Sequence, residues 1–75
     1  MTRDQIASAF GDVPITTRDS LRAGNCPDGT RSWINKWADG RTSGTVSNVL
    51  NTGAPLDEYV LRAIAVAIAR QRASA

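Results

Sequence analysis

Histidine is absent from this 75-residue chain, and cysteine occurs once, at Cys26. Without an imidazole, neither a Ser–His nor a Cys–His nucleophilic pair can be built. A single thiol with no imidazole is also too few ligands for a zinc site, and it cannot form an intramolecular disulfide. We therefore predict a protein that is not an enzyme, that uses no metal or cofactor, and that belongs in a reducing compartment.

Aromatic residues and long hydrophobic runs are scarce as well. The chain has one phenylalanine, one tyrosine and two tryptophans, so the large pieces available for a core are few. Its longest apolar stretch, residues 59–69, is interrupted by Arg62 and is far too short for a bilayer span. No apolar run follows Met1, as a signal peptide would require. We expect a soluble, cytoplasmic protein with no membrane partner.

The overall composition is that of an ordinary small globular domain. Apolar residues make up 41% of the chain and charged residues 21%, and the formal net charge is +2. This excess of positive charge is too small to indicate an anionic partner by itself. We find no linker, low-complexity segment or internal repeat, which predicts a single domain over residues 1–75. A chain this short is near the size at which self-association adds needed stability.

Two capping boxes predict the first two helices. Residues 2–5 have Thr at the N-cap and Gln at N3, and the helix they start would end at Gly11. Residues 16–19 repeat the pattern with Thr and Asp, and Gly24 would end that helix, in which Leu21 is the apolar anchor. Residues 12–15 contain a proline and are expected to form a connector.

A third helix is predicted from Pro27 to Trp37. Proline fits the first helical position because its missing N–H would have no partner there, which leaves Cys26 at the N-cap as a small, buried, inert residue. Residues at three- and four-residue spacing form one apolar stripe, which we expect to be buried: Thr30, Trp33, Ile34 and Trp37. The opposite face carries Asp28, Arg31, Ser32, Asn35 and Lys36.

Two further helices complete the predicted fold. Residues 45–50 have helical spacing of apolar side chains, although a strand is an alternative that lacks a partner strand. Pro55 is expected to open the longest helix, Leu56–Arg72, with its core stripe widened by Leu61, Ala65 and Val66. We predict an all-α bundle of four or five short helices, in which this longer C-terminal helix packs against Phe10, Leu21, Trp33 and Trp37.

The segment from Thr16 to Trp37 is the sharpest candidate for function, because it predicts a helix-turn-helix-like unit. The outer face of its second helix offers Arg31, Ser32, Asn35 and Lys36, which are residue types that contact base edges and phosphates. Arg41, in the following loop, adds a further cation. Positions that are usually small or apolar in this motif hold Asp19, Ser20 and Asn25, so a merely solvated face remains an alternative.

The string DSLRAGNC at residues 19–26, followed by Gly29, Thr30 and Trp33, resembles a motif of short uncharacterised bacterial proteins. The resemblance covers residues 19–33. It implies a bacterial or phage-related origin and a recurring helix-turn-helix unit, and it carries no established activity.

Two functions from different classes follow from these observations. The first is a small DNA-binding or regulatory protein, of phage or mobile-element origin, that binds double-stranded DNA through Arg31, Ser32, Asn35, Lys36 and Arg41. The second is a protein-interaction or assembly module, or a self-associating protein, whose contact surface on the C-terminal helix comprises Tyr59, Leu61, Ala65 and Val66.

Overall fold

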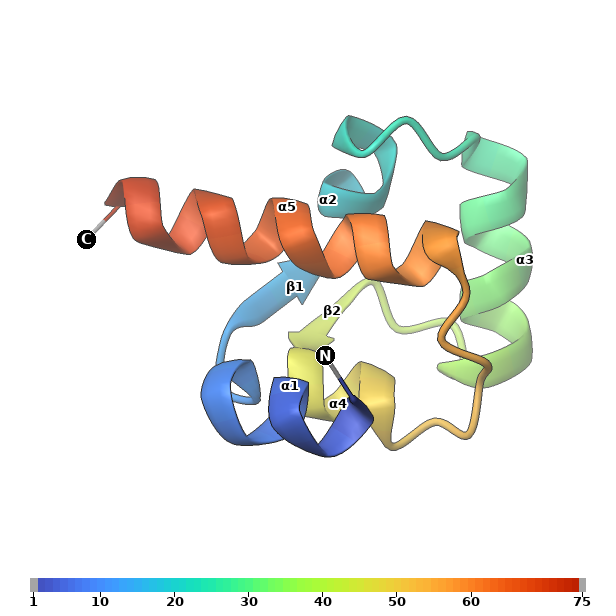
Figure 1. Ribbon diagram of the computed structural model, residues 1–75. Helices are drawn as coiled ribbons and strands as arrows, with labels where there is room; N and C mark the ends of the chain where they lie inside the picture. Colours follow the sequence, from blue (N-terminus) through green and yellow to red (C-terminus); the bar gives the residue numbers. More distant parts are fainter. Residues whose placement is uncertain (1, 75) are drawn as a thin grey trace.

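A computed structural model describes residues 2–74, which form one predominantly helical body (Figure 1). Its elements, in chain order, are α1 (Arg3–Phe10), β1 (Pro14–Thr16), α2 (Thr17–Arg22), α3 (Pro27–Trp37), β2 (Ser43–Thr45), α4 (Val46–Leu50) and α5 (Glu58–Ser74). The predicted number of helices and the longer C-terminal helix are confirmed. Met1 and Ala75, the ends of the predicted domain, lie outside the described residues.

The prediction of a purely helical fold is wrong in one respect, because β1 and β2 form a small antiparallel sheet. Pro14 pairs with Thr45, Ile15 with Gly44, and Thr16 with Ser43. The connector at residues 12–15 therefore contains a strand, and the segment before α4 has the partner strand that we did not foresee. Strands of three residues are too short to show an alternating pattern, and Pro14 stands at the first position of its strand, where proline is tolerated.

Most helix starts are where the capping residues predict them. The boxes at residues 2–5 and 16–19 are present, and Thr45 with Asn48 forms a third at α4. Cys26 caps α3, its sulfur accepting the Gly29 N–H at 3.2 Å, although it is exposed rather than buried. The longest helix begins at Glu58 rather than after Pro55.

The late start of α5 has a local cause. The Asp57 carboxylate accepts the backbone N–H of Val60 at 3.0 Å, and this side-chain cap fixes the first turn. Aspartate is a better N-cap than the residues around Pro55, so the helix begins there.

The strand–helix unit β1–α2 is similar to the strand–helix unit β2–α4, a relation that the sequence did not reveal. Each has a strand, a threonine N-cap, a carboxylate or amide at N3, and a glycine with positive φ at the same later position: Thr16, Asp19 and Gly24 in one unit, Thr45, Asn48 and Gly53 in the other. The Thr17 N–H donates to the Thr42 carbonyl at 3.0 Å, and the Val46 N–H donates to the Val13 carbonyl at 2.9 Å.

The packing of the helices follows the same relation. Helix α1, which precedes β1, packs on α4, while α3, which precedes β2, packs on α2. A pseudo-two-fold axis through the Ile15–Gly44 pair therefore exchanges α1 with α3, β1 with β2, and α2 with α4. Helix α5 lies outside this symmetry and crosses α2 and β1 (Figure 1).

The core lies between α5, the sheet and the two helices α1 and α4. Its buried apolar residues are Ile6, Val13, Ile15, Val46, Leu50, Ala54, Val60, Ala63, Ile64 and Ala67. Phe10 and Trp33 pack at its edge, as expected in part, but Leu21 is 44% exposed and does not anchor α2. The predicted stripe on α3 is half-buried throughout, so α3 is not a wall of the core.

An ion pair fastens α5 to α2 in place of the predicted Leu21 contact. Arg70 Nε and Nη2 donate to the two carboxylate oxygens of Asp19, each at 2.9 Å, and Nη2 also donates to the Pro14 carbonyl at 2.9 Å. Burial raises the pKa of the Asp19 carboxyl, but the hydrogen bonds from Arg70 and Thr16 and the charge of Arg70 outweigh this and leave the pKa below its ordinary value. The same contacts raise the pKa of Arg70.

Candidate nucleic-acid interface

Helix α3 stands at the edge of the body and is reached through a tight corner at residues 23–26. Gly24 has φ 92°, in the left-handed region that favours glycine, and it ends α2 abruptly. Asn25 Nδ2 donates at 3.0 Å to both Ser20 Oγ and the Tyr59 carbonyl. The Ser20 and Thr30 hydroxyls hydrogen-bond at 2.8 Å. These bonds hold the start of α3 to α2 and α5, while the rest of α3 extends away.

The polar face of α3 is exposed along its length. Arg31, Ser32, Asn35 and Lys36 are all exposed, and they span about 140° of the helix circumference at about 100° per residue. The opposite face carries Trp33, Ile34 and Trp37, which are half-buried. The Lys36 ammonium lies 5.1 Å from the Trp37 ring, so its stem is partly ordered by the indole. The helix therefore presents four hydrogen-bonding side chains outward on a supported backbone.

Arg41 does not share that face, because it lies in the loop between α3 and β2. The Arg41 side chain lines a cleft on the inner side of α3, while its neighbour Thr42 accepts the Thr17 N–H and so brings the loop and the start of α2 together. A shallow depression of about 430 Å³ beside them is lined by hydroxyls and arginines: Thr16, Thr17, Arg18, Asp19, Arg22, Thr42, Ser43 and Arg70. Since Asp19 is neutralised by Arg70, the free charges around this depression are cationic.

Arg18 and Arg22 are candidate functional residues that the sequence analysis did not select. They lie four residues apart on α2, and both are exposed. That spacing puts two side chains on one face of a helix, which is the signal that could have indicated them. Arg41 lines the cleft next to the inner face of α3 and not the depression beside these two arginines.

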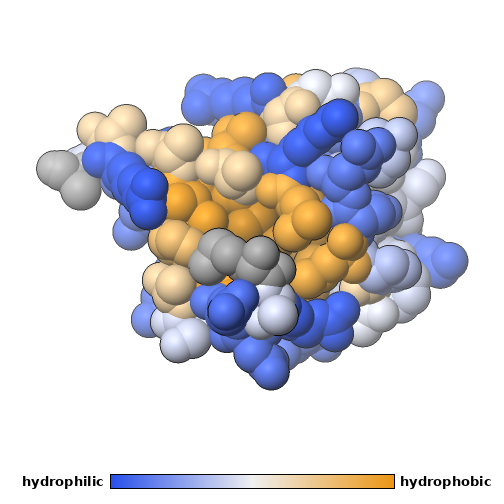
Figure 2. Space-filling model, in the orientation of Figure 1, coloured by the Kyte–Doolittle hydropathy of each residue, from blue (hydrophilic) through white to orange (hydrophobic). Residues whose placement is uncertain are grey.

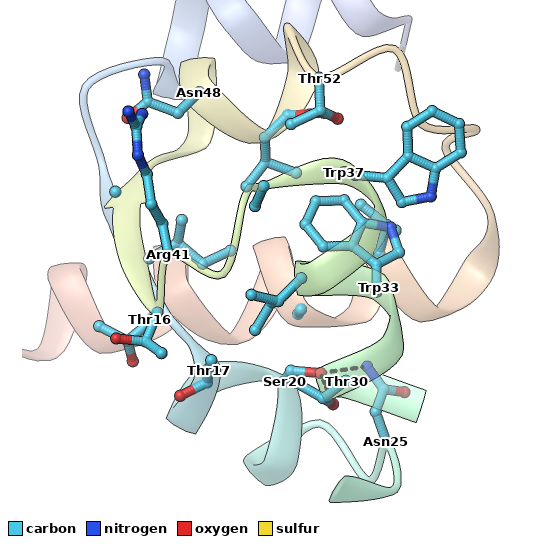
Figure 3. A pocket seen from close by; sticks show the side chains of 18 of the residues that line it. Thr16, Thr17, Ser20, Asn25, Thr30, Trp33, Trp37, Arg41, Asn48 and Thr52 are labelled. Carbon is cyan, nitrogen blue, oxygen red and sulfur yellow. Dashed lines mark hydrogen bonds between the residues drawn. The ribbon is translucent and has the colours of Figure 1, made fainter. Parts of the chain in front are cut away.

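The inner face of α3 borders a cleft of about 540 Å³ (Figure 3). Trp33, Ile34 and Trp37 line it from α3, and residues of α2, β2, α4 and the start of α5 line it from the other elements. The lining includes the apolar side chains of Val49 and Val60 and several threonine and serine residues. The corner at residues 23–26 and the loop at residues 38–42 hold α3 away from α4. The tryptophans therefore line an open cleft instead of filling a core.

The second predicted surface, on α5, is divided by the structure. Tyr59 and Leu61 are 56% and 40% exposed, Ala65 is exposed and Val66 is half-buried. Tyr59 and Val66 lie seven residues apart on one flank of the buried stripe, whereas Leu61 and Ala65 lie on the other flank. Figure 2 shows apolar surface along α5 and toward α1. These four residues do not form one continuous contact surface.

Within residues 2–74, no three His, Cys, Asp or Glu side chains gather closely enough to hold a metal ion. None of the helices described has the length and apolar character that crossing a membrane requires. Comparisons of the chain with protein-family models, with curated proteins and with solved structures gave no match.

Proposed function

We propose that this protein binds double-stranded DNA through the outer face of α3. The observation that carries the proposal is the placement of that helix: it projects from the body on a short corner, with Arg31, Ser32, Asn35 and Lys36 all exposed on one side. Arginine and asparagine are the side chains that read guanine and adenine edges in a major groove, and lysine and serine contact phosphates.

The two arginines of α2 extend this surface. Arg18 and Arg22 are exposed cations near the start of the helix-turn-helix-like unit, where such a protein crosses the sugar–phosphate backbone. In this arrangement α3 supplies base contacts through Arg31 and Asn35 and phosphate contacts through Ser32 and Lys36, and the two arginines of α2 supply further phosphate contacts. The role is that of a cytoplasmic regulatory protein, in keeping with a phage or mobile-element origin.

The proposal is tested with a double variant, Arg31→Ala with Lys36→Ala. Binding to a duplex of about 25 base pairs at low salt should fall at least about tenfold. The slope of log affinity against log salt concentration should decrease by about 1, since Lys36 contacts a phosphate and about 0.9 counterions are released for each phosphate contact. Fluorescence anisotropy with a labelled duplex measures both quantities.

A matched control removes two positive charges from another part of the molecule. Arg3 and Arg72 lie near α1, where Arg72 stacks on the Phe10 ring at 5.6 Å. Arg3→Ala with Arg72→Ala should leave affinity within about twofold. Equal losses from both double variants, or no salt-sensitive binding by the unmodified protein, would show that α3 does not bind DNA.

A further inference from the structure

The pseudo-two-fold axis gives α5 an equivalent position on the opposite half of the molecule. Helix α5 packs on α2 and β1, so its symmetry-related position lies against α4 and β2. No helix of residues 2–74 occupies it. The cleft reaches this position: its lining includes Thr45, Asn48, Val49 and Thr52, the counterparts of Thr16, Asp19, Ser20 and Ala23, and it extends from there to Thr16, Thr17 and Ser20.

We propose that the cleft binds an amphipathic α-helix of a partner protein, which carries an acidic residue opposite Arg41. The lining of the cleft is largely apolar. Trp33 and Trp37 line it with their indole rings (Figure 3), and Val49 of α4 and Val60 of α5 line it as well. A groove of this kind is filled by apolar side chains at i, i+3, i+4 and i+7 of a docked helix.

The charge of the partner follows from a comparison of the two halves. On the α5 side the receiving residue is the Asp19 carboxylate, and α5 supplies the Arg70 guanidinium. In the cleft the equivalent residue is the neutral Asn48, and Figure 3 shows the side chain of Arg41 running toward it along the cleft. The cation is therefore on the receiving side at this place, while the two carboxylates that also line the cleft, Asp39 and Asp57, lie beyond the end of α3 and at the start of α5. A helix with glutamate or aspartate at that place complements it.

The same comparison argues against a second copy of this chain as the occupant. The helix of this protein that packs in the symmetry-related position is α5. It carries Arg70 at the place where a carboxylate would complement Arg41. Its own α5 is also fastened to α2 by the Asp19 ion pair. Self-association through the cleft is thus an outcome that the experiment below distinguishes.

A peptide made from α5 is a suitable probe. A peptide of residues 56–74 keeps the apolar stripe that packs in the equivalent position, and Arg70→Glu reverses its charge. That substitution also prevents the peptide from displacing α5, because it would place a carboxylate beside Asp19. The chain has two tryptophans, both in the cleft, and the peptide has none, so tryptophan emission of the full-length protein reports on the cleft alone.

The expected result is a saturable blue shift of tryptophan emission with the Arg70→Glu peptide. The peptide with native Arg70 should bind about tenfold more weakly, since it brings a like charge to Arg41. The variant Arg41→Glu should reverse this preference. Arg41 is exposed, so the substitution is expected to leave the far-UV circular dichroism unchanged. Leu61→Asp, on the outer flank of α5, is the control and should bind both peptides as the unmodified protein does.

Several results would overturn the proposal. These are the absence of a saturable shift, equal binding of the two peptides, a preference for the native peptide, or a preference that Arg41→Glu does not change. A blue shift on concentrating the protein alone, with dimers in sedimentation, would assign the cleft to a second copy instead. The outcome does not depend on DNA binding, because the peptide contacts the inner face of α3 and the duplex titration tests the outer face.

Discussion

Asp19 is, among residues 2–74, the one charged side chain that is completely buried. The sequence predicts its role as the N3 residue of a capping box, and the structure confirms that role. The sequence does not reveal the contact between Asp19 and Arg70, because the two residues are far apart in the chain and a carboxylate at N3 is explained by capping alone. A residue that satisfies one local rule gives no sign of a second, long-range partner.

This ion pair predicts a pH-dependent stability. The pKa of Asp19 is lower in the folded protein, so its contribution is present above the ordinary pKa of aspartate, about 4, and is lost as the pH falls through the folded value. Asp19→Asn keeps the shape and the acceptor but removes the charge. We expect it to lower the free energy of unfolding by about 1–2 kcal/mol at pH 7, and by less as the pH falls below about 4.

Urea unfolding at pH 7 and at pH 3 measures this difference. Asp57→Asn is the matched control, since Asp57 is an exposed N-cap and asparagine caps a helix equally well. It should change stability by less than about 0.5 kcal/mol at either pH. If Asp19→Asn lowers the free energy of unfolding by the same amount at both pH values, the carboxylate charge is not what stabilises the contact with Arg70.

At the scale of single elements, local chemistry predicted most of the helices. Capping boxes, Pro27 at the first helical position and Gly24 at the corner all act within a few residues, so the sequence shows them directly. The strands were missed because each spans three residues and is fixed by the other. The tryptophan stripe was correctly placed on one face of α3, yet its burial depends on how far α3 stands from α4, which no local pattern records.

The corner between α2 and α3 predicts a second stability effect. Gly24→Ala places a side chain at φ 92°, although no atom lies within 4 Å of the added carbon. The substitution should therefore lower the free energy of unfolding by about 1–2 kcal/mol through backbone strain alone. Thermal unfolding should show a lowered Tm, and Arg22→Ala, an exposed neighbour in the same corner, should have a much smaller effect. A Tm unchanged by Gly24→Ala would indicate that the corner relaxes to another conformation.

For the molecule as a whole, the pattern of caps and apolar spacing in the sequence correctly predicts a predominantly helical fold. It does not predict the relation between the two halves, because the repeat consists of a threonine, an amide or carboxylate, and a glycine separated by dissimilar residues. The candidate DNA-binding residues of α3 could be selected from their helical face, and the spacing of Arg18 and Arg22 on α2 offers the same kind of signal, whereas the cleft depends on how β1 and β2 bring distant segments together.

Removing α5 is expected to unfold the protein. The helix supplies four of the ten buried apolar residues: Val60, Ala63, Ile64 and Ala67. A chain shortened to Asp57 should lose its helical circular dichroism and its dispersed NMR spectrum, because so small a core cannot offset the conformational entropy of the chain. A chain shortened to Arg72 lacks Ala73 and Ser74, which are exposed, and should remain folded. A folded, cooperative protein ending at Asp57 would contradict this prediction.

The first half of the chain, α1–β1–α2, and the second half, α3–β2–α4, pack their helices on one another, which determines what happens when the backbone is cut. Since α1 packs on α4 and α3 packs on α2, each half stabilises a helix of the other, and neither contains a core of its own. A protease that cleaves the exposed Gly24 peptide would leave two fragments that remain bound to one another. Separated in denaturant, each fragment would be a disordered peptide, and mixing them would restore the native protein by complementation.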